Sequence, residues 1–137
     1  MQPLPYPEPG GSLELLRPLL NLGEAEHWIL YVAWLMGCLN PRGPYPILIL
    51  QGEHGSAKSM GARIAKALLD PEETPLLPPP TNDYALLIAA THTWILAYDN
   101  LSGISRETGD AICRLATGGG NRARKLYTDS DLSLIHI

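Results

Sequence analysis

The sequence predicts an α/β domain in which helices cover a parallel sheet. Two short apolar runs, residues 46–51 and 93–98, have the length and composition of buried strands. Helical patterns precede, separate and follow these runs, and such alternation is typical of parallel sheets. A glycine-containing loop joins the first run directly to the next helical pattern. These observations predict a sheet core preceded by an N-terminal helical segment.

Length and composition limit the possible classes of protein. The chain has 137 residues, enough for one domain, and 45% of them are apolar, enough for a packed core. The net charge is −4, so binding to nucleic acid would require a local basic patch. Cys38 and Cys113 lack nearby metal-ligand partners, which predicts two reduced core thiols and no zinc site. Because the chain has no signal peptide and no apolar run of about 20 residues, we expect a cytoplasmic protein without a membrane span.

The N-terminal part divides into two regions. Residues 1–11 are rich in proline and are expected to form a flexible leader, and residues 12–45 form the helical segment. The clearest helix there is expected over residues 24–39, ended by the proline- and glycine-containing turn at 40–44. Its packed face is predicted from apolar side chains at helical spacing: Trp28, Tyr31, Val32, Leu35, Met36 and Leu39.

The predicted core extends over residues 46–131. Helices are expected over 58–70, 83–90 and 105–117, and a short strand over 126–128. The first of these helices is predicted to pack through Met60, Ile64 and Ala67 or Leu68, and the last through Ile104, Ile112 and Leu115. Residues 132–137 resemble a translated sequencing adapter. We interpret them as a non-native tail on a truncated chain, and a genuine terminal strand is the alternative.

The loop after the first apolar run carries a phosphate-binding pattern. It consists of Gly52, Glu53, His54, Gly55, Ser56, Ala57, Lys58 and Ser59. Glycines let the backbone wrap around phosphates, and the following helix directs its positive end toward the anion. Lys58 would contact the β- and γ-phosphates and Ser59 would ligate Mg²⁺, which predicts binding of ATP with Mg²⁺. A chance turn between a strand and a helix is the alternative.

One position departs from this pattern, because Ala57 replaces the second glycine. Its cost depends on the local φ angle. A negative φ would cost almost nothing, whereas a positive φ would cost roughly 1 kcal/mol or more.

A carboxylate at the end of the second apolar run provides the expected partner of the loop. Asp99 ends this run, and nucleotide-hydrolysing proteins use such a carboxylate to hold Mg²⁺ through water. Asn100 stands where many ATPases have an acid that activates the attacking water. An amide cannot accept that proton, although it can orient water. Catalytic roles are therefore assigned to Lys58, Asp99 and Asn100, but hydrolysis stays open, and a simple turn at residues 99–100 is the alternative.

A basic, glycine-rich segment follows the last predicted helix. Three glycines at 118–120 precede Arg122, Arg124 and Lys125. Cations on a loop with this composition suit contacts with DNA phosphates, and a solvated surface turn is the alternative.

The motifs together resemble a known family. The loop with residues 40–46, the segment Asp99-Asn100-Leu101-Ser102-Gly103, and residues 113–120 and 124–129 are similar to ATPases encoded by phages and integrated elements. These resemble superfamily 3 helicases of the AAA+ class, including the helicase part of primase–helicases. The resemblance implies a partial P-loop NTPase core and a homo-oligomeric ring that moves on DNA, expected to be single-stranded. It also implies that Arg122, Arg124 and Lys125 occupy a DNA-contacting hairpin.

Three functions remain after this comparison. The first is a helicase-like ATPase that acts in phage or mobile-element replication. The alternatives are a nucleotide-binding regulatory module without hydrolysis and a P-loop kinase of small molecules. A polar sensor residue and an arginine finger, which the helicase family requires, are not assigned in this chain.

Overall fold

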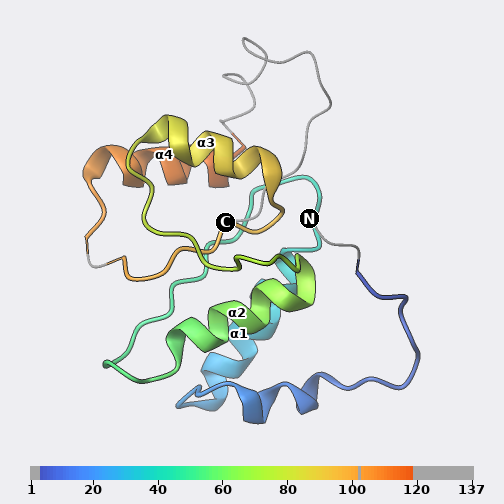
Figure 1. Cartoon of the computed structure of the whole chain (residues 1–137). Helices are drawn as coiled ribbons and strands as arrows, with labels where there is room; N and C mark the ends of the chain where they lie inside the picture. The colour runs from blue at the N-terminus through green and yellow to red at the C-terminus, as the bar shows by residue number, and fades with distance from the viewer. Residues whose placement is uncertain (1–3, 102, 119–137) are drawn as a thin grey trace.

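A computed structural model describes residues 4–101 and 103–118. Two short 3₁₀ helices, η1 (Leu13–Leu15) and η2 (Arg17–Leu19), precede four α-helices: α1 (Ala25–Gly37), α2 (Lys58–Leu69), α3 (Asp83–His92) and α4 (Arg106–Ala116). Figure 1 shows α1 with α2 in one layer and α3 with α4 in another, with long non-helical segments running between them. None of the described helices is long and apolar enough to cross a membrane.

The predicted parallel sheet is wrong. Residues 4–101 and 103–118 contain no β-strand, so the α/β class with a partial P-loop NTPase sheet core is not what this structure shows. An isolated parallel bridge joins Leu77 and Tyr98. The domain is instead built from helices and extended segments.

The first apolar run shows why the strand prediction failed. Its side chains alternate between half-buried and exposed, with Ile47 43% and Ile49 72% exposed, so the run is not buried on both faces. Among the described residues, no backbone hydrogen bond joins residues 47–51 to another extended segment. Apolar β-branched residues favour an extended backbone, but a strand also needs a neighbour that pairs with its N–H and C=O groups.

The helix predictions are confirmed to within a few residues at each end. Side chains at the N-caps explain two of the starts. Asn82 accepts a hydrogen bond from the backbone N–H of Ala85 at 2.8 Å and begins α3. Ser105 accepts one from Thr108 at 3.1 Å and begins α4.

The predicted packed face of α1 is confirmed at Trp28, Tyr31 and Leu35, which are buried, whereas the packed face of α2 differs from the predicted one. Met60 is 53% and Leu68 46% exposed, whereas α2 buries Gly61, Ala65 and Lys66. On α1, Trp34 is buried and Met36 is exposed. Counting apolar residues could not identify the buried face of α2, because this face includes a lysine whose ammonium group is fully paired.

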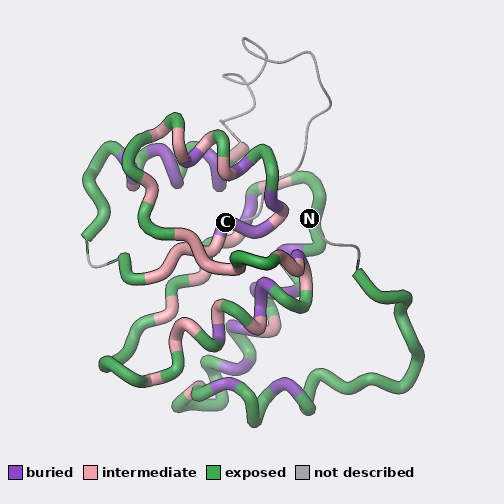
Figure 2. The backbone as a smooth tube through the Cα atoms, in the orientation of Figure 1, coloured by how far each residue is buried: buried purple, intermediate pink, exposed green. Residues whose placement is uncertain are grey.

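Residues 93–98 lie between two separate apolar clusters. Ile95, 3% exposed, belongs to the cluster formed with α1 and α2, and Leu96, 5% exposed, belongs to the cluster formed with α3 and α4. Successive side chains of an extended chain point in opposite directions, so one segment can serve both clusters. The predicted burial of this run is confirmed, but the predicted strand is wrong, because the described residues contain no strand. Figure 2 shows the buried positions gathered on the inner sides of the layers.

Candidate functional site

The loop before α2 adopts a left-handed backbone at two positions. Gly55 has φ +83° and Ala57 has φ +62°, and Ala57 is the N-cap of α2. The strained alternative therefore holds for Ala57, since left-handed backbone costs a residue with a Cβ roughly 1–2 kcal/mol. This conformation turns the chain sharply from the loop into the helix and leaves Lys58 as the first helical residue.

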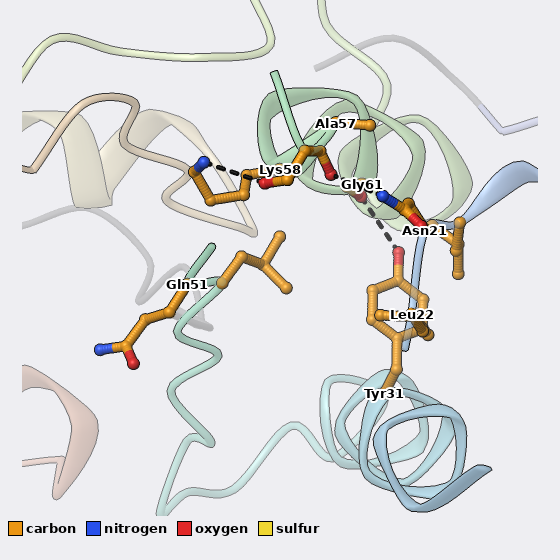
Figure 3. Close-up of a pocket in the computed structure, with 10 residues that line it drawn as sticks. Asn21, Leu22, Tyr31, Gln51, Ala57, Lys58 and Gly61 are labelled. Carbon is orange, nitrogen blue, oxygen red and sulfur yellow. Dashed lines mark hydrogen bonds between the residues drawn. The ribbon is translucent and has the colours of Figure 1, made fainter. Parts of the chain in front are cut away.

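Lys58 is folded back onto its own loop. Its Nζ donates hydrogen bonds to the carbonyl oxygens of Gly52 at 2.9 Å and Glu53 at 2.5 Å, and to Ser56 Oγ at 3.1 Å. Figure 3 shows the side chain curled over the loop at the start of α2. The ammonium group thus lies beside the first turn of a helix, where the backbone N–H groups and the helix dipole also favour an anion.

Ser59 and Asp99 are brought together although they are far apart in the sequence. Ser59 Oγ donates to Asp99 Oδ1 at 2.9 Å and lies 3.1 Å from Oδ2. Asp99 Oδ1 also accepts from the backbone N–H of Asn100, which has φ +57°. A hydroxyl and a carboxylate are oxygen ligands of the kind that Mg²⁺ takes, together with phosphate oxygens and water.

These two residues would not hold a metal ion by themselves. The described residues contain no group of three or more histidine, cysteine or acidic side chains placed to bind one. The donor set fits an ion that keeps most of its ligands as water and phosphate, as Mg²⁺ does in nucleotide sites.

A small cavity of about 80 Å³ lies against the loop, with Ser56, Ala57 and Lys58 in its wall. Its walls come from the segment before α1, from α1, from the first apolar run and from the start of α2 (Figure 3), with Leu20, Asn21, Tyr31, Leu50, Ala57 and Gly61 among the lining residues. Tyr31 Oη donates to the Gly61 carbonyl at 3.1 Å, and burial, aided by the nearby Cys38, raises the pKa of Tyr31 to about 12. The phosphate pattern could not reveal this cavity, because its walls include residues from outside the motif.

A buried polar cluster was also missed by the sequence analysis. Lys66 of α2 is 2% exposed and contacts Asp70, which is 1% exposed, and Thr93. Burial raises the pKa of the Asp70 carboxyl, but hydrogen bonds from Lys66, Thr93 and the Ile95 backbone, with the charge of Lys66, lower it below its ordinary value. A lysine and an aspartate four residues apart are ordinary on an exposed helix face, so their spacing gave no signal of burial.

The two cysteines differ in burial. Cys38 is fully buried and burial raises its pKa to about 12, but Cys113 is exposed, so the prediction of two core thiols is wrong for Cys113. The basic residues Arg122, Arg124 and Lys125, the strand predicted at 126–128 and the tail at 132–137 lie outside the described residues.

Fold and site together define a small helical domain with a polar site where α2 begins opposite the end of an extended segment. Residues 13–136 match the family described as the actinomycete integrative conjugative element replication protein. The chain belongs to this family. No match to it is found among curated proteins or among solved structures.

The family match confirms the part of the resemblance that concerns mobile elements. The chain is a replication protein of a mobile-element family, as the phage and integrated-element motifs predicted. The match does not extend to superfamily 3 helicases, so ATP binding and helicase activity are matters for proposal.

Proposed function

We propose that this replication protein binds ATP with Mg²⁺ through the loop at residues 52–59. The observation that carries the proposal is the contact of Ser59 with Asp99, at 2.9 Å, at the first turn of α2 and next to Lys58. A cation, a hydroxyl and a carboxylate are thereby gathered at a helix N-terminus, which is the set of groups that a Mg²⁺-bound triphosphate requires.

Each residue has a distinct role in this proposal. The amides of the loop and of the first turn of α2 contact the phosphates, and the Lys58 ammonium exchanges the loop carbonyls for β- and γ-phosphate oxygens. Ser59 ligates Mg²⁺ directly and Asp99 holds it through water. Bound Mg²⁺ supplies charge neutralisation at the phosphates.

Hydrolysis depends on a group other than Asn100. The Asn100 amide accepts no proton from water, so it can only orient the attacking molecule. We propose that the complete site hydrolyses ATP slowly in the absence of DNA. The base or the activating charge then comes from a neighbouring subunit of a homo-oligomeric ring.

The motor function rests on the basic segment. We propose that Arg122, Arg124 and Lys125 contact the phosphates of single-stranded DNA and that DNA stimulates hydrolysis. DNA-stimulated turnover supports the motor. Tight ATP binding without turnover supports the regulatory module, and phosphate transfer to a metabolite supports a kinase.

Arg124→Ala is expected to weaken DNA binding and flatten its salt dependence while ATP affinity stays unchanged.

Lys58→Ala tests the nucleotide site itself. Removing a charge-assisted contact of roughly 1.5–3 kcal/mol should lower the affinity for ATP with Mg²⁺ by about 10- to 100-fold in a calorimetric titration. Arg63→Ala is the matched control, because Arg63 is an exposed cation on the same helix. Equal ATP affinity of Lys58→Ala and the wild-type protein would show that the loop has been misinterpreted.

A further inference from the structure

The end of α2 is tied to residues 93–95 by a buried polar cluster. Lys66 Nζ donates to Asp70 Oδ2 at 2.8 Å, to the Ile95 carbonyl at 2.8 Å and to Thr93 Oγ1. Asp70 Oδ2 accepts from Thr93 Oγ1 at 2.6 Å and from the backbone N–H groups of Trp94 at 2.7 Å and Ile95 at 2.9 Å. We call Lys66, Asp70 and Thr93 the anchor cluster.

The contacts of the anchor cluster can all form in one arrangement of α2 and residues 93–95. The three N–H groups of the lysine each have an acceptor in the cluster or its backbone, and Glu72 adds a carboxylate 2.9 Å away at the edge. A buried ion pair adds little net stability over an apolar replacement, but leaving one member unpaired is costly. Any shift of residues 93–95 along α2 would separate several of these partners at once.

The distances along the two segments match. Ser59 and Asp70 are 11 residues apart on a helix, about 16 Å at 1.5 Å per residue. Trp94 and Asp99 are five residues apart on extended backbone, about 16 Å at 3.3 Å per residue. The two segments run in opposite directions, since the start of α2 meets Asp99 and its end meets Trp94. Contacts at both ends can therefore form together.

We propose that the anchor cluster sets the register of residues 93–99 against α2 and thereby positions the Asp99 carboxylate opposite Ser59. Lys66 and Asp70 are positioning residues in this proposal, and their effect on Mg²⁺ rests on the proposed nucleotide function. A slip of one residue would move Asp99 by about 3.3 Å and turn its side chain to the other face. It would also exchange Ile95 and Leu96 between the two apolar clusters.

The test compares two variants of the anchor cluster with a control variant, and Asp99→Asn serves as the reference for loss of the carboxylate. Lys66→Met/Asp70→Asn removes both charges together, because removing one would leave a buried charge unpaired. Thr93→Val is a milder change that retains the ion pair. The control is Arg114→Met/Asp83→Asn, which removes an exposed pair of the same chemistry, 2.8 Å apart, between α4 and α3.

The first measurement does not depend on nucleotide. The Asp99 backbone N–H donates to the Leu77 carbonyl at 3.0 Å, so its hydrogen exchange reports the register at the far end of the segment. We expect exchange at Asp99 to be at least 10-fold faster in the double variant and unchanged in the control. If exchange accelerates at Trp94 and Ile95 only, the cluster supports its own end of the segment and the proposal is overturned.

The second measurement is the factor by which Mg²⁺ raises ATP affinity over that in EDTA. In the double variant this factor should fall to that of Asp99→Asn, while the affinity in EDTA stays within about twofold of wild type. An unchanged Mg²⁺ factor overturns the register proposal. If exchange at Asp99 is faster in the double variant but the wild-type protein binds no ATP, the register proposal is supported and the proposed nucleotide function is overturned. If the double variant does not fold, the same two quantities are measured in Thr93→Val. Hydrogen exchange at Asp99 should again become faster, and the Mg²⁺ factor should again fall.

Discussion

Ala57 departs from the phosphate-binding pattern and adopts a backbone conformation that is strained for a residue with a Cβ. The phosphate pattern has a glycine at this position, and the structure holds Ala57 at φ +62°, in the region that glycine adopts freely. The sequence left the cost of the replacement open, because that cost depends on the sign of φ. Because φ is positive in the structure, the alanine costs roughly 1–2 kcal/mol relative to glycine before any compensation.

Ala57→Gly is therefore expected to stabilise the protein. Relief of the left-handed strain exceeds the extra backbone entropy of glycine, so the unfolding free energy should rise by about 0.5–1 kcal/mol in urea titrations. The matched control is Ala67→Gly at an exposed interior position of α2, which should cost about 1 kcal/mol. Destabilisation by both variants would contradict the positive φ at Ala57.

Asp70 makes the free energy of unfolding depend on pH in the acid range. Its carboxyl has a lowered pKa in the folded protein, so the charged form stabilises the fold above the ordinary carboxyl pKa of about 4. This contribution is lost as pH falls through the lowered folded value. The difference in unfolding free energy between wild type and Asp70→Asn should be constant above about pH 5 and shrink below pH 4. Denaturant titrations across this range measure it, and a constant difference down to pH 2 would contradict the assignment.

At the scale of elements, α1 and α2 are joined by a tyrosine rather than by apolar ridges alone. Tyr31 of α1 is 2% exposed and its hydroxyl contacts the Gly61 carbonyl of α2 at 3.1 Å. A Cβ at Gly61 would lie 3.5–3.8 Å from the side chains of Leu50 and Leu20, which are ordinary contact distances, so the approach of the two helices does not require a glycine here. Tyr31 was predicted on the packed face, but its hydrogen bond depends on how the helices are placed.

Tyr31→Phe should cost about 1 kcal/mol of unfolding free energy, because it removes one buried hydrogen bond and little apolar contact. Thermal or urea unfolding measures this loss. Tyr84→Phe on α3 provides the control, since Tyr84 is 73% exposed and its loss should be within 0.5 kcal/mol of zero. Equal effects of the two substitutions would show that the Tyr31 contact contributes nothing specific.

At the scale of the whole molecule, the two apolar clusters share the segment that carries Ile95 and Leu96. The three tryptophans are all associated with the cluster of α1 and α2, two as members and Trp94 packed against it. The cluster of α3 and α4 contains no tryptophan among its described members. Tryptophan fluorescence therefore reports one cluster, and a substitution in the other tests whether they unfold together.

Leu86→Ala removes a fully buried side chain from the cluster of α3 and α4 and should cost about 2–5 kcal/mol. Because one segment joins the clusters, we expect Leu86→Ala also to lower the unfolding midpoint that tryptophan fluorescence reports for the other cluster. Ile88→Ala on the same helix is the control, because Ile88 is 44% exposed. A tryptophan midpoint that Leu86→Ala leaves unchanged would mean that the two layers unfold independently.

The sequence by itself determined the helices, the loop and its partner residue. Apolar periodicity, caps and glycine placement are local signals, and they located α1 to α4 within a few residues. The motif also named Ser59 and Asp99, which the fold brings into contact.

Tertiary structure decided what depends on neighbours. Whether residues 46–51 pair as a strand depends on another backbone beside them, and the described residues provide none. The buried place of Lys66 depends on Asp70 and Thr93 lying around its ammonium group. The backbone angle of Ala57 depends on the turn into α2. Local sequence sets the preference of each segment, but packing between distant segments selects which preferences are realised.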